Sequence, residues 1–133
     1  MKILDVEGIG PVYAARLERA GVRTTDALLK RGASLEDRRL LADATGIGEH
    51  LILEWVNLAD LYRIRGVGSQ YSDLLEEAGV DTVVELATRF PQHLRDTLVE
   101  VNKAKNVVNK MPGINQVANW VKQAKKLPRV ITY

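Results

Sequence analysis

The stretch that decides the fold is Gly8-Ile9-Gly10-Pro11-Val12-Tyr13-Ala14-Ala15-Arg16-Leu17-Glu18-Arg19-Ala20-Gly21-Val22. It returns 58 residues later, at 66–80, as GVGSQYSDLLEEAGV, and farther on the offset becomes 65, where Trp55-Val56 matches Trp120-Val121. Self-similarity at a nearly constant offset is the mark of a duplicated structural unit. The sequence therefore predicts two diverged copies of one unit, at 1–60 and 61–127, with an inserted loop near 99–112 and a tail at 128–133.

Helix signals follow each start of the repeat. Pro11 suits the first position of a helix that ends where Gly21 can adopt a left-handed cap. Thr24 or Thr25 can cap a second helix that runs to Gly32, and Ser34 can cap a third that runs to Ala44, with acidic residues in its first turn. Short helices separated by glycines are therefore expected through the first copy.

A longer helix is predicted over 49–63, where no glycine or proline interrupts the apolar pattern. Sustained two-residue alternation is absent, so no strand is predicted except in the tail at 130–132. A chain of 133 residues falls within the size of one domain. The predicted fold class is all-α, with both copies sharing the core of a compact single body.

Three glycine turns precede helices, and we call them the first, second and third glycine turns: Gly8–Gly10, Gly46–Gly48 and Gly66–Gly68. The equivalent place in the second copy reads Met111-Pro112-Gly113-Ile114-Asn115, where the glycine pair is lost. Trp55 and Trp120 occupy matching positions beside valines, so we expect both to pack in the core.

The composition of the chain excludes several classes of function. The chain has no cysteine, which excludes disulfides and thiolate chemistry, and it has no apolar run long enough to span a bilayer. His50 and His93 lack further ligands at metal-binding spacing. With no catalytic triad, phosphate loop or acidic metal cluster, the sequence predicts a noncatalytic cytoplasmic protein without cofactor, metal or membrane anchor.

Charge is divided unevenly along the chain. Residues 1–60 carry eight Lys/Arg against ten Asp/Glu, and residues 61–97 carry four against six. Residues 98–133 carry seven against one, so the basic character belongs to the last third. Such a segment suits an anionic partner such as nucleic acid or an acidic protein, although it also suits a solvated helix face.

The pattern from Leu4 to Leu17, followed by Ala20-Gly21-Val22-Arg23-Thr24, resembles the helix-hairpin-helix repeat of DNA repair and replication proteins. It is particularly similar to the repeats of family X DNA polymerases. The stretch at 65–82 resembles the same repeats. The whole chain resembles a bacterial family of uncharacterised function built from tandem copies of this unit. The resemblance implies a SAM-like, polymerase-repeat type of helical fold and sequence-nonspecific binding to the DNA backbone.

Physical chemistry gives the glycine turns an independent reason to bind phosphate. Glycine lets an anion approach the main-chain N–H groups at the start of the next helix, where the helix dipole adds attraction. Lysines on one side of a C-terminal helix would add counter-charge. The candidate nucleic-acid-binding residues are Gly8, Ile9, Gly10, Arg16, Gly46, Gly48, Gly66, Val67, Gly68, Ser69, Lys122, Lys125 and Lys126.

The charge beside the turns departs from the DNA-binding pattern. DNA-binding repeats usually carry Lys or Arg just after the second glycine, whereas here Gly10 is followed by Pro11-Val12 and Gly48 by Glu49-His50. Asp73 lies on the helix behind the third turn. The alternative is that the turns only join helices, in a protein–protein interaction or self-assembly module that binds no nucleic acid.

Overall fold

A computed structural model describes residues 1–6 and 8–133. Glu7, which belongs to the first repeat motif, lies outside the described residues. The chain forms two compact units, Met1–Asp60 with Val130–Tyr133, and Leu61–Arg129. All described regular structure is helical, apart from one isolated bridge between Lys2 and Thr24, and no strand forms in the described tail.

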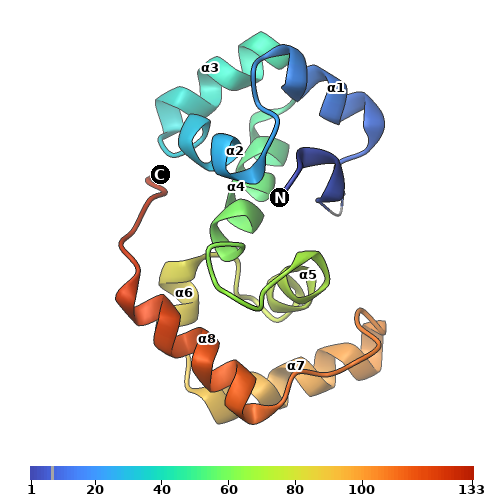
Figure 1. The fold of residues 1–133 in the computed structure, drawn as a ribbon, viewed down its shortest axis with the longest axis vertical. Helices are drawn as coiled ribbons and strands as arrows, with labels where there is room; N and C mark the ends of the chain where they lie inside the picture. Colours follow the sequence, from blue (N-terminus) through green and yellow to red (C-terminus); the bar gives the residue numbers. More distant parts are fainter. Residues whose placement is uncertain (7) are drawn as a thin grey trace. The chain divides into compact units, whose positions relative to one another are not determined.

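The first unit contains a short 3-10 helix, η1, and four α-helices (Figure 1). Their bounds are η1 Ile3–Asp5, α1 Pro11–Arg19, α2 Thr25–Arg31, α3 Leu35–Thr45 and α4 Glu49–Leu61. Pro11 is the first residue of α1, and the Thr24 and Ser34 hydroxyls cap α2 and α3 by accepting from Ala27 N and Asp37 N, each at 3.1 Å. Gly21 has the left-handed φ, +89°, that its predicted cap needs.

The second unit has the same kinds of helix cap and aromatic pair as the first. Its helices are α5 Ser69–Glu77, α6 Val83–Ala87, α7 Pro91–Lys105 and α8 Ile114–Lys126. Gly79 has a φ of +88°, and the Thr82 hydroxyl caps α6 by accepting from Glu85 N at 3.2 Å. Each unit also holds one tilted Tyr–Trp pair, Tyr13–Trp55 at 5.2 Å and Tyr71–Trp120 at 5.3 Å between ring centroids.

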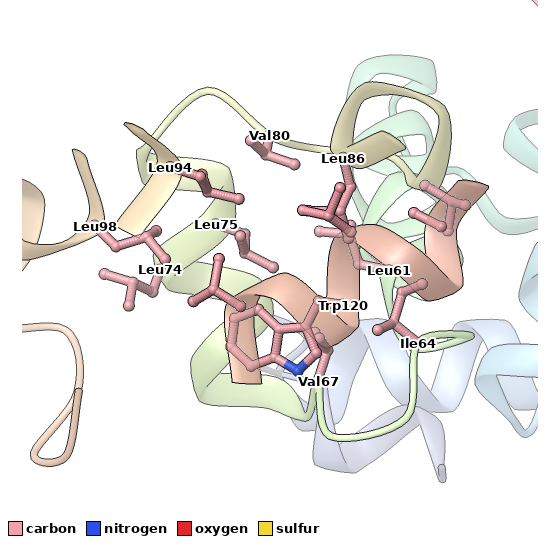
Figure 2. Packing of buried hydrophobic residues seen from close by; sticks show 14 of the residues in the cluster. Leu61, Ile64, Val67, Leu74, Leu75, Val80, Leu86, Leu94, Leu98 and Trp120 are labelled. Carbon is pink, nitrogen blue, oxygen red and sulfur yellow. The ribbon is translucent and has the colours of Figure 1, made fainter. Parts of the chain in front are cut away.

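The core of the second unit is aliphatic around one indole. Figure 2 shows Trp120 among leucines and valines from α5, α6 and the third glycine turn. Trp120 is 1% exposed and Trp55, in the first unit, is 3% exposed, so the prediction that both tryptophans pack inside is confirmed. No described helix is both long enough and apolar enough to cross a membrane.

The insertion in the second copy is not the loop that its length suggested. Helix α7 continues to Lys105, and only then does Asn106, with a φ of +50°, end it. Nothing between Leu98 and Lys105 breaks a helix, since the segment lacks glycine and proline. The inserted residues therefore lengthen a helix first, and 106–113 alone form the connection to α8.

The tail returns to the first unit and satisfies a buried arginine. Arg38 is 2% exposed and donates to three carbonyls, Gly32 O at 2.9 Å, Ala33 O at 3.2 Å and Thr132 O at 2.8 Å. Thr132 N donates in turn to Ala33 O at 2.8 Å, and Ile131 is buried. A buried charge is tolerable only with such hydrogen-bond partners, so the tail is part of the first unit's packing.

Candidate nucleic-acid interface

Three helices that follow a glycine begin without a side-chain cap from that residue. Gly10 precedes α1, Gly68 precedes α5 and Gly113 precedes α8, and these N-cap residues, like Phe90 before α7, make no side-chain cap hydrogen bond. Helices α2, α3 and α6 instead have Thr or Ser caps. A helix whose first N–H groups lack a side-chain acceptor keeps donors and a positive dipole end available to an anion.

The middle residue of each glycine turn is an anchor. Ile9 is 4% exposed, Ile47 is 3% exposed and Val67 is 5% exposed, so each side chain is packed into its own unit. Gly8 and Gly66 have φ values of +90° and +94°, which only glycine adopts readily. The side chains of Ile9 and Val67 therefore cannot touch a ligand, and any contact at these two positions would come from the main chain.

Two exposed basic residues of the first unit lie beside the second glycine turn. Arg16 and Arg19, on α1, line a hollow of about 190 Å³ together with Ala44 and Thr45, the last residues before Gly46. The Arg16 guanidinium lies 5.9 Å from the Tyr13 ring centroid, while Arg19 Nε donates weakly to Ala15 O at 3.4 Å. Both arginines are exposed, so the hollow offers two guanidiniums to an anion.

The second glycine turn itself is poor in positive charge. Glu49 begins α4 directly after Gly48, and its carboxylate accepts from Arg39 Nε at 3.3 Å on the surface. The His50 ring lies close to Gly48, so that a Cβ added there would meet it at 3.1 Å. A carboxylate in the first turn competes with an external anion for the helix dipole, so this helix start is the least suited to phosphate.

The third glycine turn lies directly against α8. Gln123 Oε1 accepts from Arg65 N at 2.8 Å, and Gln123 Nε2 donates to Arg65 O at 3.1 Å. A Cβ added at Gly66 would come within 3.1 Å of Trp120 Nε1, so glycine is needed for this close approach as well as for its φ. The helix that carries the three candidate lysines is thus hydrogen-bonded to the backbone of a glycine turn within one unit.

Arg65 is a basic residue that the sequence analysis missed. Its side chain is exposed beside Gly66, while both of its main-chain groups are held by Gln123. DNA-binding repeats usually carry their positive charge after the second glycine, whereas here Gly68 is followed by Ser69-Gln70. The available signal was an arginine immediately before the first glycine of the third turn.

The acidic residues of α5 are partly neutralised by α7. Lys105 forms an ion pair and hydrogen bond with Glu77, which raises the pKa of Lys105. Burial, followed by the nearby Glu77 charge, raises the pKa of Asp73 above its usual value, although Lys105 opposes this shift. The repulsion that Asp73 and Glu77 would exert on a phosphate is reduced by this lysine.

Lys122, Lys125 and Lys126 are all exposed on α8, whose buried residues are Val117, Trp120, Val121 and Ala124. No acidic residue occurs in this helix. The structure brings these lysines into the same unit as Gly66, Val67, Gly68 and Ser69. The other candidates, Gly8, Ile9, Gly10, Arg16, Gly46 and Gly48, belong to the first unit.

A second hollow, of about 280 Å³, lies in the first unit among Leu35, Arg38, Glu49, His50, Leu53 and Tyr133. Its walls are mostly apolar, and the Tyr133 ring stacks 5.7 Å from the Arg38 guanidinium. Within the described part of the chain, no three His, Asp or Glu side chains gather as metal ligands do. His50 and His93 are both exposed.

The fold and these surfaces define an all-α protein with glycine-led helix starts and a basic C-terminal helix. The chain belongs to the family described as "Domain of unknown function (DUF4332)", whose model matches residues 7–127. The match covers both units apart from the first six residues and the tail. No curated protein and no solved structure matches the chain.

Proposed function

We propose that this protein binds DNA without catalysing a reaction, holding the phosphate backbone through its glycine turns and the basic groups beside them. In this account the two units are diverged tandem helix-hairpin-helix copies, sharing one scaffold role in the cytoplasm. The observation that carries the proposal is the contact of α8 with the third glycine turn. It places the most basic helix of the chain next to an uncapped helix start.

The energetics favour phosphate over a neutral ligand. Main-chain N–H groups and the helix dipole supply short-range attraction, while Arg65, Lys122, Lys125 and Lys126 supply exposed positive charge. Each phosphate that such a residue neutralises releases condensed counterions, which makes this contribution to binding salt-dependent and independent of sequence. Phosphate contacts of this kind position a protein on DNA without reading bases.

Changing Gly10 and Gly68 together to Asp is expected to weaken this binding strongly without damaging the fold. Both glycines have extended backbone with negative φ, and a Cβ at either meets nothing within 4 Å. Asp is a preferred helix N-cap, so its carboxylate would occupy the N–H groups that a phosphate needs. We expect duplex affinity, measured by fluorescence anisotropy, to fall by a factor of about 10–100.

The matched control is Gly10→Asn with Gly68→Asn, which caps the same helices without negative charge. It should weaken binding less than the Asp pair, and both variants should keep thermal stability within a few tenths of a kcal/mol. Unchanged affinity in a folded Asp double variant would contradict a phosphate contact at these turns.

A second candidate function is a protein-binding or self-assembling module. The first unit favours it because Val12 and Leu40 are 66% and 62% exposed, and acidic residues outnumber basic ones over 1–60. Val12 is the second residue of α1 and therefore lies at the N-terminal end of this helix, where a phosphate would bind if the protein holds DNA. A mass that rises with concentration in light scattering, without DNA binding, would favour this function.

A further inference from the structure

The exposed face of α8 carries a regular polar stripe. Asn115, Asn119, Lys122 and Lys126 follow one another at helical spacing, four, three and four residues apart. All four are exposed. The stripe lies opposite the buried row of α8, which is formed by Val117, Trp120, Val121 and Ala124. One half of this face therefore offers amides and the other half offers ammonium groups.

The contacts within the second unit leave this stripe available. The side chains of Asn115, Lys122 and Lys126 make no hydrogen bond or ion pair with other described residues, whereas Asn119 Oδ1 accepts from Gln123 Nε2 at 2.7 Å. That bond uses the Asn119 carbonyl oxygen and leaves its amide hydrogens available to other acceptors. A solvated helix face usually mixes both charge signs in pairs along the helix, and α8 contains no acid to form them.

We infer that α8 lies in the major groove of duplex DNA, with Lys122 and Lys126 on phosphates and Asn115 and Asn119 facing base edges. This inference rests on the proposed DNA-binding function and assigns it a surface. Charge complementarity favours a polyanion, and amide side chains suit the acceptors and donors of adenine in the major groove. Thirteen residues make a helix about 20 Å long, which the major groove of B-form DNA admits.

Other nucleic acids fit this face less well. The major groove of an RNA duplex is too deep and narrow for side chains to read. Single strands are usually held by aromatic side chains that stack on bases, and the exposed stripe of α8 has none. Duplex DNA is the partner whose shape and charge both match.

The test compares two charge-matched double variants with the intact protein, using one fluorescein-labelled DNA duplex of mixed sequence over a salt series. Lys122→Gln with Lys126→Gln should make the slope of log affinity against log salt shallower by about 1.8, because two phosphate contacts are lost. Lys103→Gln with Lys110→Gln removes the same charge elsewhere in this unit and should leave the slope unchanged. Thermal unfolding checks that all variants remain folded.

A second measurement addresses the groove. A duplex in which 7-deazaadenine replaces adenine lacks the N7 acceptor of the major groove. The intact protein should bind it several-fold more weakly, and Asn115→Ala combined with Asn119→Ala should remove that difference. Indifference of the intact protein to 7-deazaadenine, or equal slope changes in the two lysine pairs, would overturn the assignment of α8 while leaving binding through the glycine turns standing. Absence of any duplex binding would overturn both.

Discussion

Replacing Trp120 by Ala is expected to lower the free energy of unfolding by about 3–5 kcal/mol. The indole is 1% exposed and stands in the aliphatic core of the second unit (Figure 2), where it also packs on Tyr71 and covers Gly66. Removing it leaves a cavity that the surrounding helices can fill only in part. Urea unfolding followed by far-ultraviolet circular dichroism measures the loss.

The control for this prediction is Trp120→Phe, which keeps an aromatic ring against Tyr71. It should cost clearly less than the Ala variant because the cavity is smaller. A loss below about 1.5 kcal/mol for Trp120→Ala would contradict the burial of this indole in the core, since that is the range of mild core changes. Trp55 remains as a fluorescent reporter of the first unit in both variants.

Replacing Arg38 by Met is expected to lower the free energy of unfolding by about 2–4 kcal/mol. Methionine fills a similar space but cannot donate, so the carbonyls of Gly32 and Thr132 lose a charged donor in a buried setting. The tail should detach in the same variant, since Arg38 Nη2 holds Thr132 O at 2.8 Å. Faster amide exchange at Thr132 N, which bonds to Ala33 O, reports that release.

The neighbouring Arg39 supplies the control. Its side chain is 65% exposed and pairs with Glu49 on the surface, so Arg39→Met removes the same charge at a cost of no more than about 1 kcal/mol. Equal losses for Arg38→Met and Arg39→Met would show that the three carbonyl contacts of Arg38 do not stabilise the first unit.

Local signals made the helices predictable from sequence. Pro11 at a first helical position, the caps at Thr24 and Ser34, and the left-handed Gly21 all depend on residues within one turn of the chain. The matching tryptophans could also be placed, because apolar residues at repeated positions indicate a shared core. The predicted helix over 49–63 ends in the structure at Leu61.

Contacts between residues far apart in the sequence could not be predicted. Arg38 reads as a surface residue in a helix with charged neighbours, and its partner Thr132 is 94 residues away. The extension of α7 to Lys105 is not predicted, because inserted residues between two helices are usually a loop. Lys110, whose carbonyl accepts from the Tyr71 hydroxyl at 3.0 Å, gives no such signal in the sequence.

The residues of the candidate site could be predicted from the sequence, but the contacts between them could not. Glycines, Ser69 and lysines could be identified by type, whereas the contact of Gln123 with Arg65 needs the tertiary structure. Arg16 is among the candidate residues from the sequence, and the structure adds that it lines the hollow beside the second glycine turn. Helix spacing alone would have placed Asn115 and Asn119 in line with the lysines.

The most direct test of the central claim is the salt dependence of binding by the intact protein. Anisotropy of a labelled DNA duplex should show binding at low salt, with log affinity falling linearly against log salt at a slope of about −3, as expected for three to four neutralised phosphates. No binding at low salt and micromolar protein, or an affinity that does not change with salt, would contradict a protein that holds the DNA backbone.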